Sequence, residues 1–291
     1  MKSCVLLPLK FLVSAGMISY LLTKLDWSLI STLETDYIAY LLAATIISVV
    51  FLAFMAVRWR LLLDRSSNLK APFLLLYQWY LVGMFFSIFL PGAIGGDVMR
   101  AKYAAQNFQL ALKKILLQIT AERLFGLAGL TIFFLIGFSN VVIDESFISA
   151  ELAILALAVG LGLFALAKYM VSRDIKVDYK SALLLLILSM AAQFADILIL
   201  FILQTYFGLS LSIWVFMLIM PVVFVATVLP VSLGGLGVRE GVMVAMLGLF
   251  SVDTSVAILL ALSLYLAKVL NGLIGAVVFI YLPAIEARSN S

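Results

Sequence analysis

Long apolar stretches separated by short polar segments dominate the pattern along this chain. A helix needs about 20 predominantly apolar residues to cross a bilayer. Stretches of this kind occupy residues 5–23, 37–57, 72–90, 119–139, 151–171, 181–205, 212–229 and 255–282. The segments 101–118 and 238–250 are less apolar, and each follows a Gly-rich interruption. The pattern predicts an all-α, polytopic integral membrane protein that forms a single transmembrane domain over residues 1–291.

The charge of the connecting segments indicates the orientation. Basic residues outnumber acidic residues in 58–70, 95–114 and 168–180, whereas acidic residues are in excess in 24–36 and 140–151. The positive-inside rule places the three basic segments in the cytoplasm. Counting the crossings from these segments then puts the N-terminus and the C-terminus on the cytoplasmic side.

The stretch 72–90 has basic segments on both sides, although it is long enough to cross. We therefore predict a helical hairpin over 72–118 that enters and leaves the membrane by the cytoplasmic face. Irregular backbone at that depth is tolerated only where it is buried in protein or lines a cavity. We expect the tip of the hairpin to form a site.

A repeated motif indicates an internal duplication. The pattern Pro-x-x-x-Gly-Gly-x-x-x-Arg at residues 91–100 recurs 139 residues later, and the pattern Ala-(Glu/Lys)-x-Leu-x-Gly-x-x-Gly at residues 121–129 recurs 146 residues later. We predict repeat 1 over 37–139 with hairpin 72–118, and repeat 2 over 181–282 with hairpin 212–250. The crossings make six full spans plus two oppositely oriented hairpins, an inverted repeat of the kind found in alternating-access transporters.

Each copy of the proline–glycine motif has the chemistry of an anion site. Proline ends a helix because it lacks an N–H group, and a glycine pair lets a ligand come close to the backbone. The half-helix that follows begins with unpaired N–H groups that suit an anion, and an arginine one turn later can fork onto a phosphate. We therefore expect a lipid headgroup to bind at Pro91, Gly95, Gly96, Arg100, Pro230, Gly234, Gly235 and Arg239. The alternative is that these glycines and prolines serve helix packing.

Ionisable residues within the spans are the second group of candidates. A charge at a helix centre costs about 2.5–3.5 kcal/mol on insertion scales, so such residues should face the bundle interior. They are Glu122, Arg123, Asp196, Glu240 and Lys268. Glu122 and Lys268 occupy equivalent repeat positions, and we expect them to pair across the two repeats, as a gating or a purely structural ion pair. We expect Asp196, with Gln193 one turn earlier, either to carry a proton or to form a hydrogen bond between two helices.

The remaining composition excludes several kinds of site. The chain has 291 residues, of which 65% are apolar and 12% charged, with no histidine and one cysteine. Histidine triads and histidine zinc sites are therefore excluded, and Cys4 alone makes no internal disulfide or thiolate metal site. No nucleotide-binding loop is present. We expect no metal, no cofactor and no nucleic acid partner. Arg58, Trp59 and Arg60, at the end of a span, are interpreted as an interfacial anchor.

Three stretches, PGAIGGDVMRA, AERLFGLAG and PVSLGGLGVREG, resemble the signatures of the lysylphosphatidylglycerol synthase transmembrane family. Members of this family are described as flippase-like and include the membrane half of the multiple peptide resistance factor. The resemblance covers nearly the whole chain and implies lipid translocation in a bacterial or archaeal cell membrane. It assigns that role to Gly95, Gly96, Asp97, Arg100, Glu122, Arg123, Gly234, Gly235, Gly237, Arg239 and Glu240. Since no soluble aminoacyl-transferring domain follows residue 291, we expect this chain not to synthesise the modified lipid.

These observations lead to one principal hypothesis and two alternatives. The principal hypothesis is a multi-pass flippase of the cell (inner) membrane that moves an anionic phospholipid or a polyprenyl phosphate between leaflets, and is not an enzyme. The first alternative is a membrane-embedded transferase that uses a lipid-linked donor, for which Asp97 and Glu122 are the available carboxylate pair. The second is a lipid-binding accessory subunit that positions a lipid-modifying synthase in trans.

Overall fold

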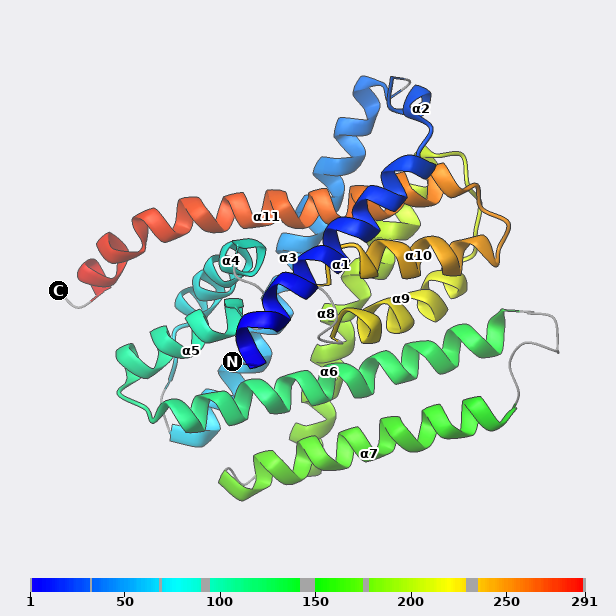
Figure 1. Ribbon diagram of the computed structural model, residues 1–291. Helices are drawn as coiled ribbons and strands as arrows, with labels where there is room; N and C mark the ends of the chain where they lie inside the picture. Colours follow the sequence, from blue (N-terminus) through cyan, green and yellow to red (C-terminus); the bar gives the residue numbers. More distant parts are fainter. Residues whose placement is uncertain are drawn as a thin grey trace.

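The computed structural model describes residues 2–31, 33–67, 70–89, 95–141, 150–174, 178–228 and 235–289. Within these ranges every element of regular secondary structure is an α-helix (Figure 1). The helices are α1 (Lys2–Lys24), α2 (Trp27–Ser31), α3 (Thr35–Ser67), α4 (Phe73–Phe89), α5 (Gly95–Phe108), α6 (Leu112–Asn140), α7 (Ala150–Asp174), α8 (Tyr179–Tyr206), α9 (Ile213–Val228), α10 (Val238–Gly248) and α11 (Thr254–Ser289).

The predicted all-α fold is confirmed, and each apolar stretch of the sequence falls on a helix. Four helical segments are long and apolar enough to cross a membrane: Thr35–Arg65, Leu112–Asn140, Tyr179–Tyr206 and Thr254–Tyr281. Shorter apolar helical segments are Leu12–Lys24, Phe73–Ile88, Ile154–Met170 and Ile213–Thr227. The chain is therefore a multi-pass helical protein in which full-length and shorter apolar helices alternate.

Local signals account for where the helices begin and end. The carboxylate of Asp253 accepts hydrogen bonds from the N–H groups of Ser255 (2.8 Å) and Val256 (3.2 Å), which caps the start of α11. Gln109 takes a positive φ of 52° and ends α5. Because α6 begins directly afterwards, at Leu112, the last residues of the predicted hairpin segment 72–118 form the first turns of α6 instead.

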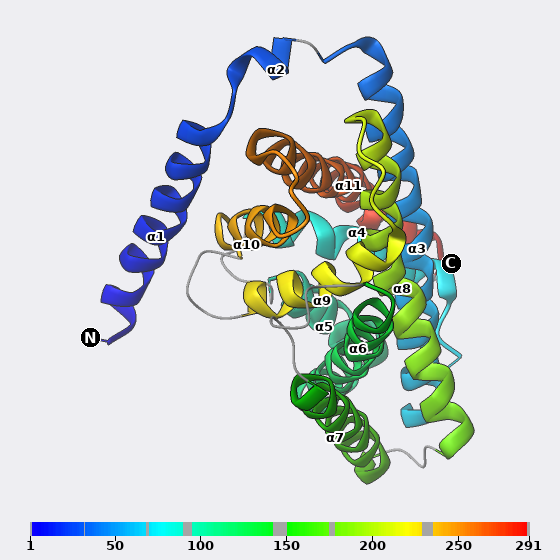
Figure 2. The ribbon, with the colours of Figure 1, turned by 90° about the vertical axis from the view of Figure 1, so that its right-hand side faces the viewer.

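Two long helices, α3 and α8, form one side of the bundle. α3 and α8 pack along each other and run side by side on one flank of the molecule in Figure 2, with α1 on the opposite flank. α4 packs against α11, and α9 packs against α6, so each of these two short apolar helices rests on a long helix from the other half of the chain. α1 contacts α10 and α11.

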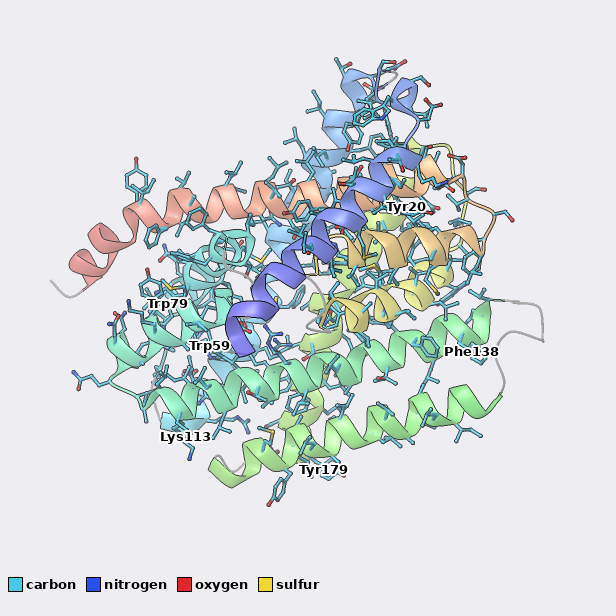
Figure 3. All side chains as sticks on the ribbon, viewed as in Figure 1. Tyr20, Trp59, Trp79, Lys113, Phe138 and Tyr179 are labelled. Atoms are coloured by element: carbon cyan, nitrogen blue, oxygen red, sulfur yellow. The ribbon has the colours of Figure 1, made fainter. Side chains whose placement is uncertain are left out.

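An aromatic cluster joins α3, α4 and α5 beneath the site described below. The rings of Trp59 and Trp79 lie 6.0 Å apart, and Tyr80 meets Trp59 edge to face at 5.8 Å (Figure 3 labels both tryptophans). Tyr103 and Phe108 of α5 pack on Trp79 at 6.0 and 5.4 Å. Trp59 and Trp79 are fully buried. The cluster fixes α5 against α4 and thereby sets the position of Tyr80.

Glycine permits the close approach of α11 to α4, and this gives a test of the packing. A Cβ added at Gly275 would fall on the backbone carbonyl oxygen of Leu81. We expect Gly275→Ala to lower the free energy of unfolding by about 1–3 kcal/mol, because a backbone atom cannot move aside cheaply. The measurement is thermal unfolding of the purified protein in detergent.

The matched control is Gly162→Ala on α7, where an added Cβ meets nothing within 4 Å. Alanine favours a helix over glycine by up to about 1 kcal/mol, so this variant should be as stable as the wild type or more so. Equal melting temperatures for Gly275→Ala and the wild type would contradict the close packing of α11 on α4.

Candidate functional site

The first turn of α5 carries the polar end of the first proline–glycine motif. Gly95 and Gly96 are buried, and a Cβ added at Gly96 would fall on the carbonyl oxygen of Gly83 and on the hydroxyl of Ser87 in α4. Asp97 lies in the first turn of α5, where the helix dipole favours a negative charge. The close contact at Gly96 brings Asp97 and Arg100 against α4.

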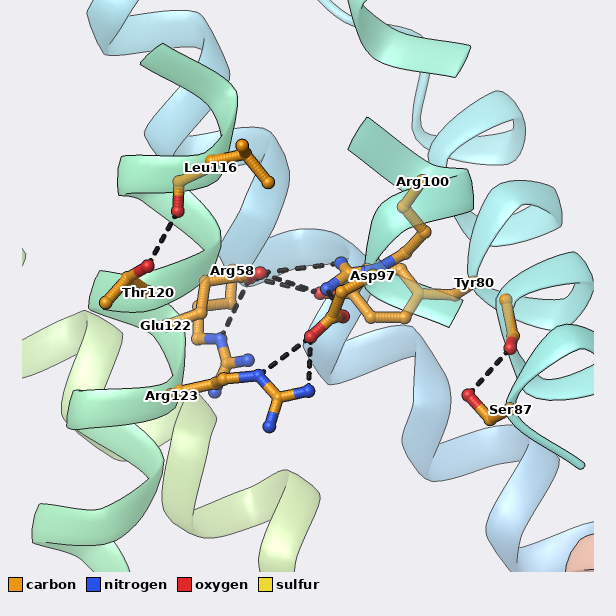
Figure 4. A network of polar contacts seen from close by, with 10 residues as sticks. Arg58, Tyr80, Ser87, Asp97, Arg100, Leu116, Thr120, Glu122 and Arg123 are labelled. Atoms are coloured by element: carbon orange, nitrogen blue, oxygen red, sulfur yellow. Dashed lines mark hydrogen bonds and ion pairs between the residues drawn. The ribbon is translucent and has the colours of Figure 1, made fainter. Parts of the chain in front are cut away.

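A network of alternating charges extends from α5 to α6 and α3 (Figure 4). Arg100 pairs with Asp97 (Nη2 to Oδ1, 2.5 Å) and with Glu122 (Nη1 to Oε2, 3.4 Å). Arg58 of α3 pairs with Glu122 through Nε at 3.1 Å. Arg123 donates to Oδ2 of Asp97 through Nε at 2.7 Å and also through Nη2. Three arginines therefore share two carboxylates.

Neutral groups complete the hydrogen bonding of this network. The hydroxyl of Tyr80 lies 3.0 Å from Oε1 and 3.2 Å from Oε2 of Glu122, to which it donates. Arg58 donates through Nη1 to the hydroxyl oxygen of Ser189 in α8 at 2.8 Å. The guanidinium of Arg100 lies over the ring of Tyr80 at 3.9 Å, in cation–π geometry. These contacts lower the cost of burying the charges.

Burial divides the network into an inner and an outer part. Arg58, Arg100 and Glu122 are 5%, 4% and 1% exposed. The side chains of Asp97 and Arg123, in contrast, are 15% and 37% exposed. The inner pairs are locked between helices, whereas Arg123 presents part of its guanidinium-bearing side chain to open space.

That open space is a cavity of about 320 Å³ bounded by α3, α4, α5, α6, α8, α9 and α11. Its charged lining consists of Arg58, Asp97, Arg100, Glu122, Arg123, Asp196 and Lys268. Lys268 of α11 donates to Asp196 of α8 at 2.7 Å, and Gln193 also lines the wall. Four basic and three acidic side chains give the lining an excess of one positive charge, which suits an anionic group.

The expected pairing of Glu122 with Lys268 is wrong. Glu122 pairs with Arg58 and Arg100, and Lys268 pairs with Asp196. α6 contacts α3 and α5, and α11 contacts α8, so each of these charges finds its partners on the helices packed beside it. Both ion pairs nevertheless line the same cavity. For Asp196, the contact is a helix–helix hydrogen bond, formed with Lys268.

The described residues of the second proline–glycine motif lie outside the lining of the central cavity. Gly235 and Gly237 have positive φ values of 84° and 81°, which favour glycine. The N–H of Gly237 donates to Glu240 at 2.7 Å, and Arg239 pairs with the same carboxylate (Nη2 to Oε1, 2.5 Å) while lying 4.8 Å from the ring of Tyr265. Among the described residues, these side chains do not line the cavity. Pro91, Pro230 and Gly234 lie outside the residues that the structure describes.

The interpretation of Arg58 and Trp59 as an interfacial anchor is wrong, since both are buried inside the bundle. Arg60 lies on another face of α3 and pairs with Asp64, both partly exposed. Residues two apart on a helix point in nearly opposite directions, so Arg58 and Arg60 could not share one role. The two-residue spacing of these arginines could have indicated that Arg58 faces the bundle interior. Nothing in the sequence around Tyr80 indicates its contact with Glu122.

No three histidine, cysteine, aspartate or glutamate side chains gather as a metal site would require, within the part of the chain that the structure describes. The carboxylates Asp97, Glu122 and Asp196 each accept from a basic side chain instead. The site is therefore one of paired charges around a cavity.

A family model described as the lysylphosphatidylglycerol synthase TM region matches residues 8–275, nearly the whole chain. No curated protein matches the chain.

Proposed function

Because this chain belongs to the family of the lysylphosphatidylglycerol synthase TM region, we propose that it is a lipid transporter that takes the headgroup of an anionic lipid into its central cavity and moves it between leaflets. A role connected with membrane lipids follows from the family itself, which is the membrane part of lipid-modifying synthases. The cell membrane is the proposed location, with both termini cytoplasmic.

The observation that carries the proposal is the state of Arg123. Its side chain is 37% exposed at the cavity wall, and its carboxylate partner, Asp97, is shared with Arg100. A phosphate that enters the cavity can replace Asp97 as the partner of Arg123 and can offer one oxygen to each of the two nitrogens, Nε and Nη2, that share Oδ2 of Asp97. Asp97 then remains paired with Arg100, so no buried charge is left alone. An anion that binds by exchange of partners can also leave again.

The packing of the helices supports the proposed inverted repeat. If α3, α4, α5 and α6 are matched with α8, α9, α10 and α11, the contact of α4 with α11 corresponds to that of α9 with α6. The contact of α3 with α11 likewise corresponds to that of α8 with α6, and the central contact of α3 with α8 corresponds to itself. A twofold relation of this kind supports alternating access, in which two similar halves rock around one site.

The charge network favours transport over the transferase alternative. A transferase needs a carboxylate free to act as general acid or base, or as a nucleophile. Glu122 is 1% exposed and accepts from Arg58, Arg100 and Tyr80, and Asp97 accepts from two arginines. These contacts occupy both carboxylates, so neither is free for such a role. The third possibility, an accessory subunit, requires the same headgroup site without movement of the lipid.

A vesicle assay tests the proposal. The full chain is reconstituted into liposomes with a fluorescent phosphatidylglycerol or a fluorescent polyprenyl phosphate, and a membrane-impermeant quencher reports exchange between leaflets. We expect the wild type to accelerate exchange of one of these lipids, and Arg123→Gln to slow it at least about tenfold, the effect of one lost charged hydrogen bond.

The matched control is Lys113→Gln, which removes one basic charge from an exposed position at the start of α6, away from the cavity (labelled in Figure 3). It should exchange lipid at the wild-type rate. Absence of exchange by the folded wild type, or equal rates for Arg123→Gln and the wild type, would refute the transporter. A labelled product formed from a lipid-linked donor would favour the transferase.

A further inference from the structure

A second cavity, separate from the central one, lies between α6, α7 and α8. It has a volume of about 480 Å³ and is lined mainly by apolar side chains, among them Ile132, Leu135, Leu161, Phe164, Leu183 and Leu186. Within the described residues, α7 packs on α6, with Gly160 close against the side chain of Thr131. The cavity occupies the space that this packing leaves between α7 and α8.

The polarity of the cavity changes toward one end. Tyr179 and Lys180, the first residues of α8, also line it. The ammonium group of Lys168 lies over the ring of Tyr179, 3.3 Å from its centroid (Tyr179 is labelled in Figure 3). Tyrosine and lysine are typical of the level of the lipid headgroups, so the apolar part extends from that level toward the bilayer centre. Over Tyr179 to Leu186 it extends about 10 Å along α8.

The size and lining of the cavity favour a hydrocarbon chain as its occupant. Water finds almost no polar partners in such a cavity, and a gap without any occupant forfeits dispersion contacts along its whole wall. A helix seated here would contact this wall over only about two turns, about 10 Å of its length. An acyl chain of the surrounding bilayer is narrow enough and meets an apolar wall.

We propose that this cavity is a lipid-binding site that takes one acyl chain of an anionic phospholipid, with the phosphodiester at Lys180 and Lys168. The bound lipid fills the space between α7 and α8 and fastens α7 to the rest of the bundle. It is a structural lipid that stays in place, distinct from the headgroup that enters the central cavity. The basic end and the apolar body together match a lipid with an anionic head and an acyl chain, and not a free phosphate.

Lipid retention by the purified full-length protein tests this site. The protein in detergent is incubated with phosphatidylglycerol or phosphatidylcholine, and native mass spectrometry counts the bound lipids. All variants carry Arg123→Gln, which weakens the central site and leaves α7 and α8 unchanged. We expect one phosphatidylglycerol to be retained in preference to phosphatidylcholine, and Leu183→Trp, which fills the cavity, to abolish this retention. Lys180→Gln should weaken it about fivefold, the effect of one basic residue at an anionic membrane surface.

Two matched controls accompany these variants. Leu184→Trp adds the same side chain at the next residue of α8, which is 43% exposed and outside the cavity lining, and Lys113→Gln removes a charge elsewhere. Both should retain the lipid. Equal retention by Leu183→Trp, Lys180→Gln and the controls would overturn the proposal. So would a dimer of the wild type that Leu183→Trp dissociates, because the cavity would then be a protein interface. Neither result bears on the vesicle assay, which tests the central cavity separately.

Discussion

Glu122→Leu should lower the free energy of unfolding by about 3–5 kcal/mol, the cost of breaking a buried ion pair by removing one partner. The carboxylate of Glu122 is 1% exposed and accepts hydrogen bonds from Arg58, Arg100 and Tyr80. Leucine fits the volume but leaves the guanidinium of Arg58 without its carboxylate inside the bundle. The measurement is thermal unfolding in detergent, together with the fraction of monodisperse protein on size exclusion.

Two further variants separate charge from shape. Glu122→Gln keeps an oxygen that accepts from Arg58 or Tyr80 and should lose less stability than Glu122→Leu. Asp178→Asn breaks the ion pair with Arg65, in which the side chains are 61% and 42% exposed, and should change stability very little. If Glu122→Leu unfolds at the same temperature as Asp178→Asn, the inner network contributes nothing to the fold and the proposed locking of α3, α5 and α6 is wrong.

The helices could be predicted from the sequence because their cause is local. A run of about 20 apolar residues in a bilayer has to satisfy its own backbone hydrogen bonds, and the helix does so within one segment. The start of α6 could not be predicted from the length of an apolar run. Lys113 and Lys114 have the composition of a loop, yet they form the first turn of a long helix. Only the positive φ of Gln109, which no pattern reveals, marks the break.

The sequence predicted which residues belong to the candidate site better than it predicted which of them pair with one another. Gly96, Asp97, Arg100, Glu122, Arg123, Asp196 and Lys268 were all expected from the sequence, and all line the central cavity. The cost of a charge within a span requires such side chains to face the interior. That cost does not determine the partner, which depends on how α3 and α8 pack, and so the pairing of Glu122 was wrong.

The second motif marks the limit of reasoning from repeated spacing. Arg100 and Arg239 occupy the same motif position, but Arg100 faces Asp97 and Glu122 in the cavity, whereas Arg239 binds its neighbour Glu240. The position corresponding to Asp97 is Leu236, so the second copy lacks the carboxylate that holds Arg100. The backbone differs as well, since Gly96 lies within α5 whereas the corresponding Gly235 has a positive φ ahead of α10, so equal spacing gave neither equal backbone conformation nor equal charge partners.

The second large effect concerns the ion pair on the other side of the cavity. Asp196→Leu removes the carboxylate to which Lys268 donates at 2.7 Å. The remaining ammonium group then lies among membrane-spanning helices, and we expect a loss of about 2.5–3.5 kcal/mol, the cost of a lysine on insertion scales. Asp196→Leu combined with Lys268→Leu removes both charges and should recover most of this loss, since an apolar pair of similar size is often as stable as an ion pair. Thermal unfolding of the single and double variants measures both effects.

The double variant also decides between a structural and a functional pair, because it is expected to fold. The double variant leaves the cavity lining with the same excess of one positive charge, but an entering phosphate loses Lys268 as a cationic donor. Exchange of the fluorescent lipid should therefore slow at least about tenfold in the stable double variant. If the double variant is stable and exchanges lipid at the wild-type rate, the pair only joins α8 to α11, and the headgroup contacts lie at Arg123 and its neighbours alone. If instead the double variant is as unstable as Asp196→Leu, the unpaired ammonium was not the cause of the loss.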